Sequence, residues 1–153
     1  MANDQNDLTT SKVSTLLTRD APFIHKGESI QQAAILMAQE NVSSLLVIDP
    51  DLLYDEESDS SPLMGIITDR DLCTRVLAQG IDPSSELENV VTPELITLDH
   101  NAYVYEAMLT MLRYNVHHLP VFKGRDPIGI IEATDIVRYE SQNSLLLVSS
   151  IFQ

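Results

Sequence analysis

One short phrase occurs twice in this chain, as GIITDRDL over residues 65–72 and as GIIEATDI over residues 129–136. Each copy is a glycine, two aliphatic residues, a polar stretch, and an aspartate that precedes another aliphatic residue. A duplicated phrase of this kind indicates an internal repeat, in which each half is a small unit that cannot cover its apolar face alone. The chain is therefore expected to fold as a pair of related halves.

The repeat extends upstream of this phrase. Residues 41–48 (NVSSLLVI) align with residues 115–122 (NVHHLPVF) at an offset of 74 residues, and the offset falls to 64 at the glycine phrase. The first copy therefore carries a ten-residue insertion, which coincides with an acidic stretch. Surface loops absorb insertions of this length at small entropic cost.

Each copy reads as β-α-β-β-α, so the fold class is α/β, more narrowly α+β. In the first copy Ser29 and Gln32 have capping-box spacing, residues 44–48 and 64–67 are apolar strands, and residues 69–79 form a helix ending at Gly80. In the second copy residues 95–98, 116–122 and 128–131 are strands, and residues 102–114 and 134–141 are helices. The predicted inward helical positions are Ile30, Ala33, Ala34, Met37 and Ala38, then Val104, Ala107, Met108, Met111 and Leu112.

These patterns predict five segments. Residues 1–12 are a flexible N-terminus, residues 13–80 are the first repeat with an acidic loop at 49–62, and residues 81–92 are a linker. Residues 93–141 are the second repeat, and residues 142–153 are an apolar exit segment. That segment could cap this domain, form a dimer contact or begin a further domain, and we favour the last. We expect the two repeats to pack face to face, since neither covers its sheet alone.

Composition excludes several classes of partner. Nine Lys and Arg residues stand against 23 Asp and Glu residues, for a net charge of −14. Nucleic-acid and anionic-lipid surfaces both require clustered basic residues, so neither partner is expected. The absence of an apolar run of membrane-spanning length and of an apolar signal core predicts a cytoplasmic protein. The acidic stretch is expected to be a solvated loop, because its spacing lacks the glycine and glutamate of an EF-hand calcium site.

No pattern of catalytic residues is present. There is no nucleophile with a matching base, no phosphate-cradling glycine loop and no metal-ligand cluster, so the chain itself is not expected to be an enzyme. The single Cys73 rules out an internal disulfide, and its place on an apolar helical face predicts a buried structural thiol. His117 and His118 are adjacent, so on a strand they face opposite sides and cannot hold one metal together. Packing or cleft lining is the better interpretation of both.

Taken together, the repeats resemble a tandem pair of CBS domains, also called a Bateman module, over about residues 13–141. The phrases VSSLLV (42–47), TDRDL (68–72) and NVHHLPV (115–121) resemble most closely the CBS pairs of bacterial signalling proteins that continue into a predicted nucleotidyltransferase domain. The resemblance implies a regulatory sensor of AMP, ADP, ATP or S-adenosylmethionine, with no resident cofactor. It also implies two clefts between the repeats, related by a pseudo-twofold axis, and a homodimer of such pairs acting on an attached or partner effector domain.

The resemblance also implies which residues contact the ligand. In the first copy Thr68 and Asp71 match the family's ribose-contacting pair, and Arg70 between them could reach a phosphate. Residues expected to line the base are Pro22, Phe23, Ile24, Ser44, Leu45 and Leu46. In the second copy Asp135 matches, whereas Glu132 stands where the family prefers Ser or Thr, and Thr134 could substitute only in part. The second base slot would be lined by Leu95, Ile96, Thr97, His118, Leu119 and Pro120.

Each of these residues has a simpler interpretation. Thr68 and Asp71 are favoured at helix starts and could serve only as a cap. Arg70 and Arg75 could be surface charges, and the tyrosines of residues 103–114 are expected to pack along their helix. A structural CBS pair that dimerises and binds no ligand is therefore the alternative to the sensor. The net charge favours that alternative, since it disfavours the approach of a phosphate.

Overall fold

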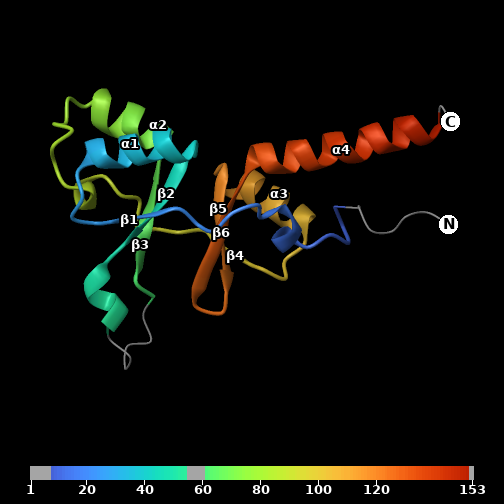
Figure 1. Ribbon diagram of the computed structural model, residues 1–153, viewed down its shortest axis with the longest axis horizontal. Coiled ribbons are helices and arrows are strands. Elements are labelled where there is room, and N and C mark those ends of the chain that lie inside the picture. The colour runs from blue at the N-terminus through green and yellow to red at the C-terminus, as the bar shows by residue number, and fades with distance from the viewer. Residues whose placement is uncertain (1–7, 55–60, 152–153) are drawn as a thin grey trace. The chain divides into compact units, whose positions relative to one another are not determined.

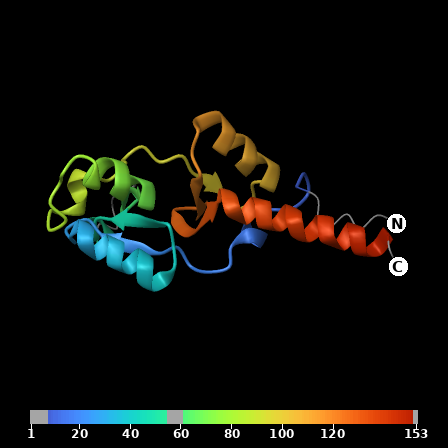
Figure 2. The ribbon, with the colours of Figure 1, turned by 90° about the horizontal axis from the view of Figure 1, so that it is seen from above.

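The computed structural model describes residues 8–54 and 61–151, which divide into two compact units (Figures 1 and 2). One unit runs from Ala21 to Leu95, and the other combines the residues up to Asp20 with those from Ile96 onward. Each unit holds one three-stranded sheet with helices, which confirms the predicted α+β class.

The unit from Ala21 to Leu95 is built on strands β1 (Phe23–His25), β2 (Ser44–Ile48) and β3 (Leu63–Thr68). β2 pairs in parallel with β1 and antiparallel with β3. Helix α1 (Ile30–Glu40) makes the crossover that a parallel pair requires. The predicted strand over residues 44–48 matches β2 residue for residue, and all five side chains are buried, as a continuous apolar run implies.

The other unit repeats this plan. Strand β5 (His118–Lys123) pairs in parallel with β4 (Leu98–Asp99) and antiparallel with β6 (Asp126–Glu132). Helix α3 (Val104–Tyr114) makes the crossover, and helix α4 (Ala133–Ile151) follows β6. The first and middle strands begin later than predicted, at Leu98 and His118. α4 continues ten residues past the predicted end at residue 141, through most of the segment predicted to be an exit.

The crossover helices begin and end as their sequences indicate. The Ser29 hydroxyl accepts the Gln32 N–H at 3.0 Å, which is the hydroxyl half of the predicted capping box. α1 ends at Asn41 and α3 ends at Asn115, with φ of 53° and 52°. Asparagine is one of the few residues other than glycine that adopt this left-handed conformation readily. The aligned asparagines therefore end the two helices in the same way.

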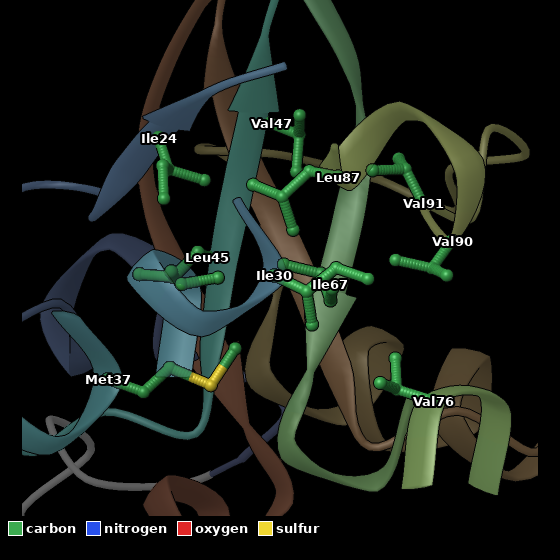
Figure 3. Close-up of a cluster of buried hydrophobic side chains, with 11 residues drawn as sticks. Ile24, Ile30, Met37, Leu45, Val47, Ile67, Val76, Leu87, Val90 and Val91 are labelled. Carbon is green, nitrogen blue, oxygen red and sulfur yellow. The ribbon is translucent and has the colours of Figure 1, made fainter. Parts of the chain in front are cut away.

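The core of the first unit lies on one face of its sheet (Figure 3). Ile30, Ala33 and Met37 of α1 pack against strand residues from all three strands. Ala34 and Ala38 were predicted to face inward but are exposed, because α1 buries only the narrow stripe at spacings of three and four. The rest of the cluster is formed by Ile24, Leu45, Val47, Ile67, Val76, Leu87, Val90 and Val91. Leu87, Val90 and Val91 come from the stretch predicted to be a linker, which contains the 3₁₀-helix Leu87–Asn89.

The core of the second unit is likewise formed by side chains from a crossover helix, the strands and the following helix. Val104, Ala107 and Met111 of α3 pack with strand residues and with Ile136 of α4. Met108 is only partly buried, and Leu112 is 74% exposed although it was predicted to face inward. The buried stripe on α3 thus occupies the same helical positions as on α1.

The described part of the N-terminal segment, which was predicted to be flexible, belongs to the second unit and is hydrogen-bonded to it. The Ser11 and Leu8 carbonyls accept the N–H groups of Val104 and Tyr105, at 2.9 and 3.0 Å. These two donors lie in the first turn of α3, where the helix itself offers no acceptor. Val13 begins the 3₁₀-helix Val13–Leu16 and is fully buried in the second core. Residues 8–13 therefore cap a helix that lies some ninety residues further along the chain.

The glycine of the repeated phrase is explained by close approach of another segment. A side chain at Gly65 would collide with the Thr92 carbonyl oxygen and Val91, because Ile66 and Thr92 exchange two backbone hydrogen bonds at 3.2 Å there. At Gly129 an added Cβ would lie 2.5 Å from Leu17. Gly65 therefore needs a residue without a Cβ, whereas at Gly129 the added atom would meet only the end of a flexible side chain.

Candidate functional site

The alternation of side chains along the strands divides the predicted base-lining residues of the first repeat. Ile24 and Leu45 point into the core, where they pack with Val47 and Ile67. Because neighbouring strand residues face opposite sides, Phe23, Ser44 and Leu46 lie on the other face. Phe23 is in register with Leu46, and Ser44 is in register with Thr68. Ile24 and Leu45, which were predicted to line a base, therefore lie in the core cluster and not on the face that carries Thr68.

The second repeat divides in the same way. Of the residues predicted to line the second base slot, Leu119 is fully buried in the core, and Ile96 is partly buried and packs against that core together with Leu98. His118 and Pro120 lie on the opposite face of β5. His118 is in register with Glu132, which is the position that Ser44 and Thr68 hold in the first unit. Thr97 is exposed just ahead of β4.

Thr68 and Asp71 form a complete capping box where β3 gives way to α2 (Asp69–Asp71). The Thr68 N–H donates to Asp71 Oδ2 at 2.9 Å, and the Thr68 hydroxyl donates to the same oxygen at 3.0 Å. In return, Thr68 Oγ1 accepts the Asp71 N–H at 3.2 Å. Three hydrogen bonds thus join these two residues, and two of them hold the Asp71 carboxylate. Its other oxygen, Oδ1, accepts no hydrogen bond from any residue that the structure describes.

The helix that follows this cap widens into a π-helix, Leu72–Leu77. Arg70 is exposed beside the capping box, while Arg75 donates to the Thr92 hydroxyl at 2.8 Å and so is committed within its own unit. Asp69 accepts the Arg70 N–H at 2.7 Å. Cys73 is exposed, which contradicts the predicted buried thiol. The apolar stripe that predicted its burial assumed α-helical spacing, whereas the π turn shifts side chains around the axis.

The corresponding end of the second repeat keeps the aspartate and changes the residue before it. Asp135 Oδ2 accepts the Glu132 N–H at 2.8 Å, which reproduces the Thr68–Asp71 backbone contact. The Thr134 hydroxyl donates to Glu132 Oε2 at 3.5 Å, and His118 Nε2 lies 4.0 Å from Glu132 Oε1. Arg138 lies 3.4 Å from Asp135 Oδ1. In this repeat the second carboxylate oxygen of the aspartate, Asp135 Oδ1, is therefore paired with the Arg138 guanidinium.

The remaining predicted lining residues flank the strands. Pro22 accepts the Leu46 N–H at 2.9 Å and is partly buried, and Phe23 is 55% exposed and stacked on His25 with ring centroids 6.3 Å apart. Leu95 closes the first unit and is partly buried. Leu46, Ser44 and Pro120 are buried, although none of them belongs to the two apolar clusters.

In the described part of the acidic stretch, Asp49 forms an ion pair with Lys26. Lys26 Nζ lies 2.7 Å from Asp49 Oδ2, and this hydrogen bond lowers the pKa of Asp49 and raises the pKa of Lys26. Asp49 is therefore held by contacts, and residues Pro50–Tyr54 form a 3₁₀-helix rather than a loop. The later acidic residues of the stretch, 55–60, lie outside the described residues. Within the described ranges, no three His, Cys, Asp or Glu side chains are placed to hold a metal, and no helix is long and apolar enough to span a membrane.

Comparison with known proteins decides the family. The sequence model of the CBS domain matches residues 13–78 and again residues 87–142. The chain belongs to the CBS domain family. It carries two CBS repeats, as the duplicated phrase predicted. The CBS domain-containing protein YhcV of Bacillus subtilis is 27% identical over 133 residues, which cover 87% of this chain and 88% of that one.

Several solved structures share the fold of this CBS pair. An uncharacterised conserved protein from Pyrococcus horikoshii has a TM-score of 0.76 at 23% identity, covering 88% of this chain and 94% of that one. The CBS domain pair of protein MJ0100, solved with 5′-methylthioadenosine and S-adenosylmethionine, has a TM-score of 0.71 at 27% identity, covering 84% and 98%. A CBS domain protein from Pyrobaculum aerophilum, complexed with AMP, has a TM-score of 0.70 at 22% identity, covering 82% and 89%.

Sequence reasoning missed two features of these CBS repeats. It did not place Ser44 opposite Thr68, or His118 opposite Glu132, because strand register is set by tertiary pairing. The aligned phrases VSSLLV and VHHLPV show only that Ser44 and His118 occupy equivalent positions. It also missed the N-terminal segment as part of the second unit, for which the sequence of residues 8–17 carries no signal.

Proposed function

We propose that this CBS pair is a regulatory module that binds an adenine nucleotide at the Thr68–Asp71 end of its first repeat. The observation that carries the proposal is the geometry of Asp71. Thr68 holds Oδ2 of the carboxylate through two hydrogen bonds, and Oδ1 accepts none from the described residues. A fixed carboxylate with a spare acceptor suits a vicinal diol, whose two hydroxyls both donate.

The surroundings of Asp71 suit the rest of a nucleotide. A charge-assisted hydrogen bond from a ribose hydroxyl contributes on the order of 1.5–3 kcal/mol. Arg70 is exposed one residue before Asp71 and offers a guanidinium to a phosphate. Phe23, which is 55% exposed, lies in register with the buried Leu46 on the same sheet face as Thr68 and offers apolar surface to a base. The ligands named for the MJ0100 and Pyrobaculum aerophilum structures, which all contain adenine, support an adenine base.

The module is proposed to act on an attached effector and to carry out no reaction itself. Regulation requires that the ligand bind two states of the module with different affinities. α4 carries Asp135 in its first turn and extends to Ile151. It is therefore the element that would transmit a ligand-dependent change from the second repeat to an effector. A following nucleotidyltransferase domain is proposed as the effector on the resemblance of residues 42–47, 68–72 and 115–121 alone. A homodimer of CBS pairs is proposed on the same basis, and light scattering that gives a monomer at all concentrations would contradict it.

Thermal unfolding with and without AMP, ATP and S-adenosylmethionine tests the proposal. A ligand at one hundred times its dissociation constant stabilises the folded state by about 2.7 kcal/mol, which raises Tm by several degrees for a chain of this size. Asp71→Asn is the matched variant, because its amide oxygen can still accept the Thr68 N–H while the charge on the diol acceptor is lost. We expect the shift in wild type and its loss in the variant.

A structural CBS pair that binds no ligand is the second candidate. The complete capping box favours it, because Thr68 and Asp71 already satisfy each other and stabilise the helix start without a ligand. This candidate predicts no change in Tm with any of the three ligands. It also predicts that Asp71→Asn and wild type remain indistinguishable when ligand is added.

A further inference from the structure

The two repeats place different chemistry at one equivalent pair of positions. In the first repeat the residue that precedes the helix, Thr68, is paired across the sheet with Ser44, so two neutral hydroxyls face each other. In the second repeat the equivalent pair is Glu132 and His118, a carboxylate and an imidazole. The aspartate three residues later accepts the same backbone N–H in both. The backbone contact is thus repeated, while the side-chain pair beside it is different.

The Glu132 carboxylate is held at this position. The Thr134 hydroxyl donates to one of its oxygens at 3.5 Å, and His118 Nε2 lies 4.0 Å from the other. The side chains of Glu132 and His118 are 30% and 17% exposed, so both are largely shielded from solvent. Asp135 lies beside Glu132 through the 2.8 Å bond to its N–H. Two carboxylates therefore border the place where the first repeat has one carboxylate and a hydroxyl.

This donor and acceptor pattern discriminates between a nucleoside and its phosphates. The ribose of a nucleoside is neutral and its hydroxyls donate, so a pair of carboxylates can accept from both. A phosphate is anionic and offers acceptors, so it gains nothing from a carboxylate and is repelled by it. Thr134 also replaces the arginine of the first repeat, and its hydroxyl already donates to Glu132.

We infer that the second repeat binds a phosphate-free adenine nucleoside and rejects nucleoside phosphates, and that Glu132 is the residue that decides this selectivity. The inference rests on the proposed function, since it assigns a ligand class to the second of the two repeats. Arg138 does not remove the repulsion, because it faces Asp135 at 3.4 Å and is 65% exposed. At a partly shielded site, like charges a few ångströms apart weaken phosphate binding by at least about tenfold.

Calorimetry on the whole chain with adenosine and with AMP tests this assignment. Wild type is expected to bind adenosine at two sites and AMP at one. Asp71→Ala should remove the AMP site, and Asp135→Ala should leave it. AMP at two equivalent sites, or adenosine at one site only, would overturn the inference while leaving the proposed function standing. Binding of neither ligand would overturn the proposed function itself.

Exchange of the residues at the two equivalent positions provides matched controls. Glu132→Thr should give AMP a second site, and Thr68→Glu should abolish AMP binding while adenosine still binds. Glu132→Gln removes the charge with little change of shape, so it reports on the same point if Glu132→Thr alters the helix start. Thermal unfolding of each variant without ligand establishes that it is folded. An unchanged AMP stoichiometry in both folded Glu132 variants would show that this carboxylate does not set the selectivity.

Discussion

Asp71 and Thr68 hold each other through three hydrogen bonds of 2.9 to 3.2 Å, in both directions. The arrangement ends β3, starts α2 and presents one carboxylate oxygen that the described residues leave unbonded. A change at Asp71 should therefore affect stability and ligand binding together, and the two effects can be separated by choice of variant.

Asp71→Ala should weaken binding of AMP more than Asp135→Ala does. The first substitution removes the diol acceptor from a site with an exposed arginine, and the second acts where Glu132 already disfavours phosphate. Loss of the cap should also destabilise the chain by about 1 kcal/mol. Calorimetric titration and chemical denaturation measure the two effects separately. Equal losses of AMP affinity would mean that Glu132 is no handicap to the second repeat.

Substitution of three glycines by alanine should cost stability in a fixed order. Gly65→Ala should be the most damaging, because the new methyl group meets the Thr92 backbone, and overpacking of this kind costs about 1–3 kcal/mol or more. Gly129→Ala should cost less, because it meets only the mobile end of the Leu17 side chain. Gly27→Ala is the control, since nothing lies within 4 Å of its added Cβ. Urea midpoints of the three variants would test the order.

Leu45 and Leu46 are neighbours with nearly equal burial, but their side chains lie on opposite faces of the sheet. Leu45→Ala should cost about 2–5 kcal/mol of stability by opening a cavity in the core cluster, with ligand affinity unchanged in the folded fraction. Leu46→Ala should reduce the affinity for adenosine and AMP alike, because Leu46 lies on the face of Thr68. A drop in affinity confined to Leu45→Ala would reverse the assignment of the two faces.

The Lys26–Asp49 pair should make stability depend on pH at both ends of the range. The pKa of Asp49 is lowered from 3.8 in the folded state, so its contribution is present above 3.8 and is lost as the pH falls through the lowered value. The pKa of Lys26 is raised from 10.5, so its contribution is present below 10.5 and is lost as the pH rises through the raised value. Asp49→Asn should remove this pair's contribution to the loss of stability at both low and high pH. Tm measured against pH for wild type and variant would show curves that converge at the extremes.

Much of the fold could be predicted from the sequence, because strands and helix ends are indicated by patterns over a few neighbouring residues. A continuous apolar run fixed β2 to the residue, and the aligned Asn41 and Asn115 mark the ends of both crossover helices. The sequence was a weaker guide where a local pattern has two interpretations. An apolar strand residue such as Leu45 or Leu119 is compatible both with a core position and with a ligand-binding surface. Cys73 would lie on a buried apolar stripe only if its helix were α-helical throughout, whereas Leu72–Leu77 is a π-helix.

The sequence by itself determined the duplication, the element order, the aspartate shared by both repeats and the glutamate that breaks their symmetry. These follow from composition, periodicity and spacing within short windows. Only the tertiary structure decided that Ser44 faces Thr68 and His118 faces Glu132, and that residues 8–13 cap α3. Strand register and the docking of a distant segment depend on contacts between residues far apart in the chain, which no local pattern encodes. The repeated glycine illustrates both points. Its position can be found from the sequence alone, whereas the segment that packs close to it is seen only in the tertiary structure.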